Sequence, residues 1–240
     1  MGGALPPTPE IPDPVPFLSR RQFLLTLGTS GLVAAGGSPP FAFAAPAPTP
    51  VTPKALRLTD QQRADLLLVQ DYLNSIHTLT SRFTQTTPDG RQSHGQIYLS
   101  RPGQMRIEYD PPIPVLLVAD GNGSIYYYDR ELQQVTDMRA NQTPAGFLLR
   151  DRIALSGDLT VTTYEHNPGA IRVGVFETKE PGDGMVTMVF DDKPLQLRQW
   201  TVVDAQRKEV TVTLDNPHFG VAVDPKLFYW TDPRPTTTGR

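Results

Sequence analysis

Cysteine is absent from the 240 residues of this chain. Its absence excludes disulfides, thiolate metal sites, covalent haem attachment and a cysteine nucleophile. It also predicts a chain without an N-terminal lipid anchor, because that modification needs a cysteine at the new amino terminus. Long apolar runs are scarce too. The run from Leu24 to Ala35 is interrupted by glycine, threonine and serine, and is too short and too polar to span a membrane.

Charge of one sign is not concentrated anywhere along the sequence. The formal net charge is −3, with 38% hydrophobic and 20% charged residues. This is an ordinary globular composition with enough apolar content for one sizeable core. Because no basic run or basic helix face occurs, neither a nucleic-acid partner nor a charge-driven role at a membrane surface is indicated.

Sequence signatures of catalysis are also few. The histidines, His77, His94, His166 and His218, are well separated and lack the spacing of metal ligands. No G-x-S-x-G elbow, P-loop or dinucleotide-binding glycine motif is present. Glycoside hydrolysis by a pair of carboxylates remains an alternative, although the sequence points to no particular pair. We therefore expect a protein that is not an enzyme and that has no metal and no cofactor.

The N-terminal region has the pattern of an export signal. Arg20-Arg21 stand just before the weakly apolar run, and Ala42-Phe43-Ala44 offers small residues for cleavage. Paired arginines in this position are typical of a twin-arginine (Tat) signal, the alternative being a chance pair before an ordinary signal or a disordered tail. We predict four segments: a Tat-type signal peptide over 1–44, a Pro-rich linker over 45–56, a single domain over 57–232 and a flexible tail over 233–240.

One amphipathic helix is expected at the start of the domain. Thr59 and Gln62 form a capping box, a common signal for a helix start. Apolar residues then recur at helical spacing as far as about His77, namely Leu66, Leu67, Val69, Leu73 and Ile76.

From Leu79 onward the pattern becomes that of strands. Eleven runs are candidates: 79–87, 93–100, 104–110, 114–120, 124–129, 132–138, 159–166, 170–179, 184–191, 195–204 and 208–215. Tight-turn sequences such as Pro88-Asp89-Gly90 separate them, which favours an antiparallel meander. A meander of this length curls towards a barrel or half-barrel. One short helix is expected over 143–150, where Thr143 can cap and Pro144 suits the first turn.

The predicted fold class is therefore mainly β (α+β), with a curved antiparallel sheet that forms an incomplete barrel. Two helices are a thin cover for so much sheet. They either pack tightly as a core or close loosely over a cavity. Arg101 follows the strand that carries Ile97 and Leu99 and leaves it on the same face, which places a cation at the rim of an apolar surface.

These features resemble the family of periplasmic outer-membrane lipoprotein carriers, LolA. The matching segments run from the first helix to the C-terminus and comprise Ser81-Arg82-Phe83-Thr84-Gln85, Tyr98-Leu99-Ser100-Arg101-Pro102, Val118-Ala119-Asp120-Gly121, Thr143-Pro144 with Phe147-Leu148-Leu149, and residues 224–230. The resemblance implies that the helices cover an apolar cavity. It implies a monomeric periplasmic carrier that accepts triacylated lipoproteins from an inner-membrane ABC transporter and delivers them to the outer membrane or a receptor there.

The resemblance also implies roles for individual residues. Arg101 matches the arginine that hydrogen-bonds to carbonyls of the lid and holds it closed, and its acceptors are expected within residues 147–150. The lid is expected to include Pro144, Phe147, Leu148 and Leu149, and the cavity wall Phe83, Ile97, Leu99, Met105, Ile107 and Tyr109. A turn-capping surface arginine and a plain sheet core are the respective alternatives. Gly146 departs from the commoner lid sequence, which suggests a lid that opens more easily.

Two other functions fit the same fold. A periplasmic binder or transporter of another lipid or amphiphile would use the same half-barrel cavity. A chaperone or scaffold without a ligand would instead have a filled interior. The identity of the ligand is the observation that separates these alternatives from a lipoprotein carrier.

Overall fold

A computed structural model of the chain describes residues 54–143 and 146–234. All of them belong to the second of two units, Pro50–Arg240. The expected signal peptide, most of the expected linker and Pro144 lie outside the described residues. So does the tail beyond Arg234.

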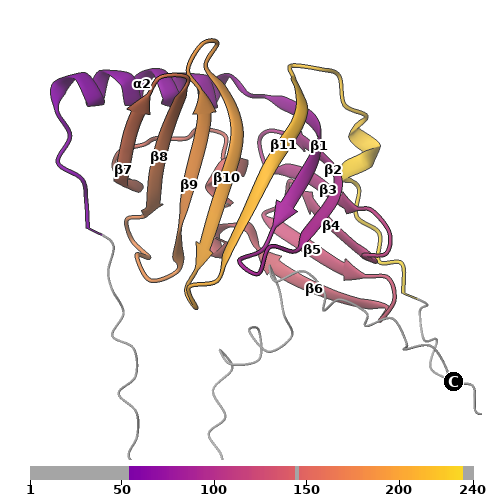
Figure 1. Cartoon of the computed structure of the whole chain (residues 1–240). Helices are drawn as coiled ribbons and strands as arrows, with labels where there is room; N and C mark the ends of the chain where they lie inside the picture. The colour runs from indigo at the N-terminus through magenta and orange to yellow at the C-terminus, as the bar shows by residue number, and fades with distance from the viewer. Residues whose placement is uncertain (1–53, 144–145, 235–240) are drawn as a thin grey trace, which may run out of the picture. The chain divides into compact units, whose positions relative to one another are not determined.

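Eleven strands form one sheet in the order β6-β5-β4-β3-β2-β1-β11-β10-β9-β8-β7 (Figure 1). Their bounds are β1 Thr78–Thr86, β2 Gln92–Ser100, β3 Gln104–Tyr109, β4 Val115–Asp120, β5 Ser124–Asp129, β6 Gln134–Arg139, β7 Leu159–Asn167, β8 Ala170–Glu177, β9 Gly184–Asp191, β10 Gln196–Asp204 and β11 Glu209–Phe219. The eleven predicted strands are confirmed. Most ends agree within two residues, and β11 continues four residues further than expected.

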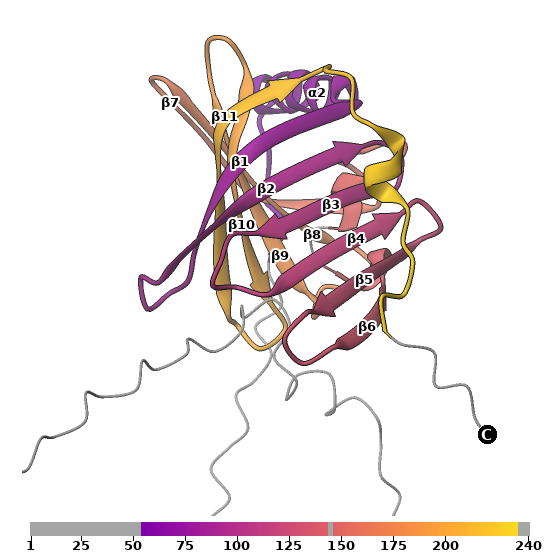
Figure 2. The same cartoon turned by 90° about the vertical axis from the view of Figure 1, so that its right-hand side faces the viewer.

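The sheet is antiparallel throughout, curved and unclosed. β6 and β7 form its two edges, and β1 pairs with β11 in its middle. Figures 1 and 2 show the two halves curling towards each other, with β6 and β7 at separate margins. The predicted fold class, a mainly β incomplete barrel, is confirmed.

The helix α2 (Asp60–Ser75) begins at the predicted capping box. The backbone N–H of Thr59 donates to Gln62 Oε1 at 2.9 Å, and that of Gln62 donates to Thr59 Oγ1 at 3.3 Å. Leu66, Val69 and Leu73 are buried, whereas Leu67 is 58% exposed. The expectation that Leu67 joins the apolar face is wrong, because residues adjacent in sequence point in different directions around a helix. No helix among the described residues is long and apolar enough to cross a membrane.

Specific polar contacts fix α2 along one end of strands β7 to β10 (Figure 1). The hydroxyl of Tyr164 in β7 donates to Asp65 Oδ2 at 2.7 Å, and the backbone N–H of Leu197 in β10 donates to the Tyr72 hydroxyl at 2.9 Å. The ring of Tyr72 also meets Phe190 edge-on, with centroids 6.0 Å apart. α2 therefore lies across the ends of these strands in a defined orientation.

The expected lid helix is a pair of short 3-10 turns in the described residues, η3 (Ala140–Gln142) and η4 (Gly146–Leu149). Thr143 does not open an α-helix. Its hydroxyl donates to the Ala140 carbonyl at 2.9 Å, at the end of η3. A Cβ at Gly146 would lie 1.8 Å from that same carbonyl oxygen. The glycine therefore permits a close approach of two backbone segments that any other residue would prevent.

The C-terminal segment covers the outer face of the sheet through a 3-10 turn, η5 (Pro225–Phe228) (Figure 2). Arg106 Nη1 in β3 donates to the Leu227 carbonyl at 3.1 Å. The ring of Trp230 stacks on Tyr126 of β5, with centroids 4.9 Å apart. This cover explains why residues 115–119 of β4 are buried on both faces and form a continuous apolar run.

Candidate functional site

The six predicted wall residues lie on one face of the sheet. Ile97 pairs with Ile107 and Leu99 with Met105 across β2 and β3, and Gly95 pairs with both Phe83 and Tyr109. Residues directly opposite each other on paired strands point to the same face. These side chains and Arg101 therefore share a common apolar surface, which we call the inner face.

Burial varies across the inner face. Phe83, Ile97, Leu99 and Tyr109 are 2%, 3%, 9% and 7% exposed. Met105 and Ile107, both in β3, are only half-buried. The inner face therefore presents partly uncovered apolar surface along β3.

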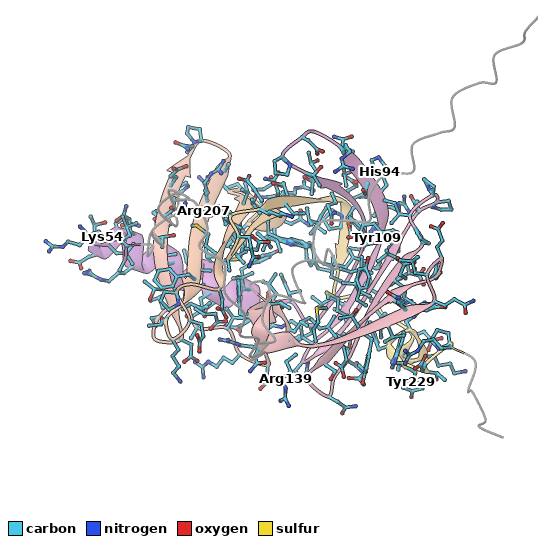
Figure 3. The ribbon with its side chains drawn as sticks, turned by 90° about the horizontal axis from the view of Figure 1, so that it is seen from below. Lys54, His94, Tyr109, Arg139, Arg207 and Tyr229 are labelled. Carbon is cyan, nitrogen blue, oxygen red and sulfur yellow. The ribbon has the colours of Figure 1, made fainter. Side chains whose placement is uncertain are left out.

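An aromatic cluster occupies one part of the inner face. A Cβ at Gly95 would come within 2.6 Å of the Phe83 ring, so the missing side chain makes room for that ring. The Tyr109 ring meets Phe83 edge-on, with centroids 5.3 Å apart. The buried Tyr109 hydroxyl donates to Gln85 Oε1 at 2.8 Å, and burial raises the pKa of Tyr109. Figure 3 shows Tyr109 towards the middle of the curled sheet and His94, of the neighbouring strand, at its outside.

Arg101 follows the end of β2, and its guanidinium donates five hydrogen bonds to four backbone carbonyls. Nη1 donates to Leu73 O at 2.5 Å and to Ile76 O at 3.2 Å. Nε and Nη2 donate to Arg150 O at 2.9 and 2.6 Å, and Nη2 also donates to Asp151 O at 3.2 Å. One side chain therefore joins the C-terminal end of α2 to the segment that follows η4.

The chemistry of helix ends explains this arrangement. The last carbonyls of a helix have no partner within it and carry partial negative charge. The last turn of α2 contains no basic residue, and Arg101 supplies the missing cation from the sheet. Burial lowers the pKa of Arg101 and the Asp151 carboxylate opposes this effect. The guanidinium nevertheless stays charged, because arginine titrates far above neutral pH.

The contacts of Arg101 include the expected acceptor and three that the sequence did not indicate. The Arg150 carbonyl lies in the range implied by the resemblance. The carbonyls of Leu73, Ile76 and Asp151 were missed, because a linear sequence does not show which helix end packs beside the turn after β2. A capping box marks the start of α2 clearly, but no comparable motif marks its end.

The segment expected to form the lid packs against the second half of the sheet. Phe147 and Leu149 are buried and Leu148 is half-buried. Beside Phe147 a narrow crevice of about 10 Å³ runs between the lid and the ends of β7 to β9, lined in part by Leu159, Val175 and Met185. That volume holds about one water molecule.

A salt bridge fastens the same segment to β8. Arg150 Nη2 lies 2.5 Å from Glu177 Oε1, and both side chains are half-buried. The backbone N–H of Gly103 also donates to Leu149 O at 2.7 Å. Sequence analysis did not single out Glu177, since a lone glutamate at a strand end carries no distinctive signal. Within the described ranges, no group of three His, Cys, Asp or Glu residues could hold a metal ion.

The geometry defines an unclosed half-barrel, in which one arginine joins the end of a helix to the segment after η4 beside an apolar inner face. Residues 74–231 match the family described as outer membrane lipoprotein carrier protein LolA. The chain belongs to that family.

Two outer-membrane lipoprotein carrier proteins show the sequence similarity of this chain to the family. The outer-membrane lipoprotein carrier protein of Methylococcus capsulatus is 30% identical over 174 residues, which cover 69% of this chain and 82% of the relative. The carrier of Pseudomonas aeruginosa is 39% identical over 102 residues, covering 39% of this chain and 49% of that protein. Among solved structures, the alignment with a LolA superfamily protein from Nitrosomonas europaea spans 68% of this chain and 97% of that protein's chain. The sequence identity is 7% and the TM-score is 0.41.

Proposed function

We propose that this protein carries triacylated lipoproteins across the periplasm. It accepts them from an inner-membrane ABC transporter, shields their acyl chains against the inner face and delivers them to the outer membrane or a receptor there. The observation that carries the proposal is the Arg101 junction, which holds α2 and the lid segment together beside partly uncovered apolar surface. The names of the relatives support the same role.

The physical need for a carrier follows from the hydrophobic effect. Each acyl methylene removed from water is worth about 0.8 kcal/mol, so three long chains cannot cross an aqueous compartment unescorted. Met105 and Ile107 supply apolar side chains that are partly exposed. An acyl chain placed there would bury surface on both partners.

Delivery requires that binding be reversible. A lid that must open before a ligand enters lowers the net affinity by the free energy of opening. The Arg101 contacts are hydrogen bonds to backbone carbonyls, which break and reform without covalent chemistry. The same side chain can therefore set both the loading barrier and the affinity.

The proposal includes export to the periplasm by the Tat route. Arg20-Arg21 and the weakly apolar run after them support this route. Replacing both arginines by lysine should abolish export, with the unprocessed chain retained in the cytoplasm on cell fractionation. Normal export of that variant would show that another route is used.

A release assay tests the carrier function. Inner-membrane vesicles that hold a labelled triacylated lipoprotein and the ABC transporter are supplied with ATP and the chain from Ala45 onward. We expect the lipoprotein to appear in a one-to-one complex outside the vesicles. Arg101→Leu should still load but should transfer its cargo poorly to outer membranes.

A second carrier of known activity serves as the control in this assay. If that carrier releases the lipoprotein and this chain does not, the lipoprotein proposal fails. The remaining candidate would then be a periplasmic binder of another lipid or amphiphile.

A further inference from the structure

A buried carboxamide stands on the inner face without a complete set of hydrogen bonds. Gln85 in β1 is 1% exposed. Its Oε1 accepts the hydroxyl hydrogen of Tyr109 at 2.8 Å, whereas its Nε2 has no hydrogen-bond partner among the described residues. Buried polar groups in folded proteins are nearly always paired, so an unpaired donor needs an explanation.

No neighbour of Gln85 among the described residues is hydrogen-bonded to this donor, and that includes Ser93, which lies opposite it on β2. Val212 of β11 lies directly opposite Gln85 and pairs in turn with Trp200 of β10. Phe83, two residues earlier on the same face, packs against Tyr109. The hydroxyl of Thr87, two residues later, already donates to its own turn. The carboxamide therefore sits in a mainly apolar environment.

The hydrogen bond from Tyr109 occupies the oxygen end of the carboxamide and leaves its nitrogen end without a partner among the described residues. Burial raises the pKa of Tyr109, so its hydroxyl keeps its proton, and it donates that proton to Gln85 Oε1. The group without a partner is then the amide N–H₂, which can only donate. A ligand that satisfies it must bring an acceptor into an apolar site.

We propose that Gln85 Nε2 is the polar anchor for the carbonyl oxygen of an ester- or amide-linked fatty acyl group. Hydrocarbon has no acceptor, and the first acceptor along a fatty acyl chain is its carbonyl. The pair of Gln85 and Tyr109 would then select ligands that are acylated over ligands that are merely apolar, and would fix how far a chain slides along the inner face. This inference rests on the proposed function, because it requires an acyl ligand on that face.

Two lipids that differ only in this carbonyl test the proposal. Dipalmitoylglycerol carries ester carbonyls, and dihexadecylglycerol has the same chain length with ether links. Both are titrated into the purified chain from Ala45 onward, by displacement of a fluorescent fatty acid. We expect wild type to bind the ester about tenfold more tightly, the value of one well-formed hydrogen bond.

Gln85→Met keeps the shape of the side chain but removes the donor, and should bind both lipids equally. Gln96→Met is the matched control. Gln96 is in β2 and points to the opposite face, where its Nε2 donates to Thr80 Oγ1 at 3.3 Å. The Gln96→Met variant should keep the tenfold preference for the ester. If Gln85 had only a structural role, Gln85→Met would instead weaken the binding of both lipids by the same factor and keep the preference.

Equal binding of ester and ether by wild type would overturn the anchor and leave the proposed function standing. That comparison needs no variant, so it decides the question even if Gln85→Met does not fold. A water molecule retained on Nε2 in a crystal structure with bound ester would also overturn it. If neither lipid binds, the proposed function fails as well.

Discussion

At the scale of single residues, Arg101 acts as a C-terminal cap supplied from outside the helix. Helices often end near a lysine or arginine of their own, which complements the partial negative charge there. α2 has none in its last turn. The cation comes instead from the turn after β2, and it reaches the Arg150 and Asp151 carbonyls at the same time.

Arg101→Leu should therefore loosen two segments at once. Hydrogen bonds from charged donors contribute about 1.5–3 kcal/mol each, so we expect amide hydrogen exchange near residues 149–153 and at the end of α2 to become at least tenfold faster. Mass-resolved exchange measures this directly. Arg82→Leu is the control, because the Arg82–Asp110 pair is exposed and such pairs contribute about 0–1 kcal/mol. Unchanged exchange in Arg101→Leu would contradict the role of Arg101 in closure.

Gly146 shows how a residue interpreted as a weak point can have a packing role. The sequence suggested that glycine loosens the lid, because glycine lowers helix stability. In the structure the segment is a 3-10 turn, and the Ala140 carbonyl occupies the place of a Cβ. The absence of a side chain therefore allows η4 to pack closely against the end of η3.

Gly146→Ala should destabilise the protein, since overpacking against backbone costs about 1–3 kcal/mol. For a domain of this size that corresponds to a fall in Tm of about 2–12 °C. Gly182→Ala is the matched control, because a Cβ at Gly182 meets nothing within 4 Å. Thermal unfolding followed by circular dichroism measures both variants. A Tm for Gly146→Ala equal to that of wild type would favour the original hypothesis of a loose lid.

At the scale of elements, the C-terminal segment covers part of the outer face of the sheet. η5 and Trp230 lie against the outer faces of β3 to β5, where Arg106 and Tyr126 contact them. Phe228 is 1% exposed, whereas its neighbour Tyr229 is 68% exposed. The segment therefore presents one side chain to the core and the next to solvent.

Phe228→Ala should cost about 3–5 kcal/mol of unfolding free energy, the usual effect of truncating a buried aromatic residue. Tyr229→Ala, one position further on, should change it by less than about 0.5 kcal/mol. Urea denaturation of the two variants gives both values. Similar effects for the two would show that η5 does not hold this register on the sheet.

Sequence reasoning predicted the elements better than their contacts. The strands could be located because turns such as Pro88-Asp89-Gly90 punctuate regular alternation, and alternation follows directly from strand geometry. η5 could not be predicted as an outer cover, because nothing in residues 224–230 specifies which face of a distant sheet they meet. Leu67 was misplaced because two adjacent leucines fit the same helical pattern, and only tertiary packing decides between them.

At the scale of the whole domain, the first and last strands of the chain pair with each other. β1 and β11 pair in the middle of the sheet, so Phe83 lies opposite Leu214 although the two are far apart in sequence. The alternation of each strand predicts this shared inner face. It does not predict the partner strand, because β1 and β11 fit many neighbours equally well. It also does not reveal the Gln85–Tyr109 pair, since the hydrogen bond depends on how far the sheet curls.

The curled sheet encloses tyrosine hydroxyls, and their titration should limit stability at high pH. Burial, assisted by the Asp129 carboxylate, raises the pKa of Tyr127 to about 12. Burial likewise raises the pKa of Tyr109. In both cases the folded protein favours the neutral phenol, whereas an unfolded tyrosine titrates near 10. The resulting stabilisation is fully present below about pH 10 and is lost as pH rises towards 12.

Urea midpoints should therefore be constant from pH 8 to about pH 10 and then fall steeply up to pH 12. Tyr127→Phe removes one titrating group while keeping its ring, so its midpoint should decline less over the same range. Comparing each protein with itself at pH 8 separates titration from any loss of packing. A decline as steep in Tyr127→Phe as in wild type would show that Tyr127 ionises without unfolding the domain, and that its part of the inner face is open to water.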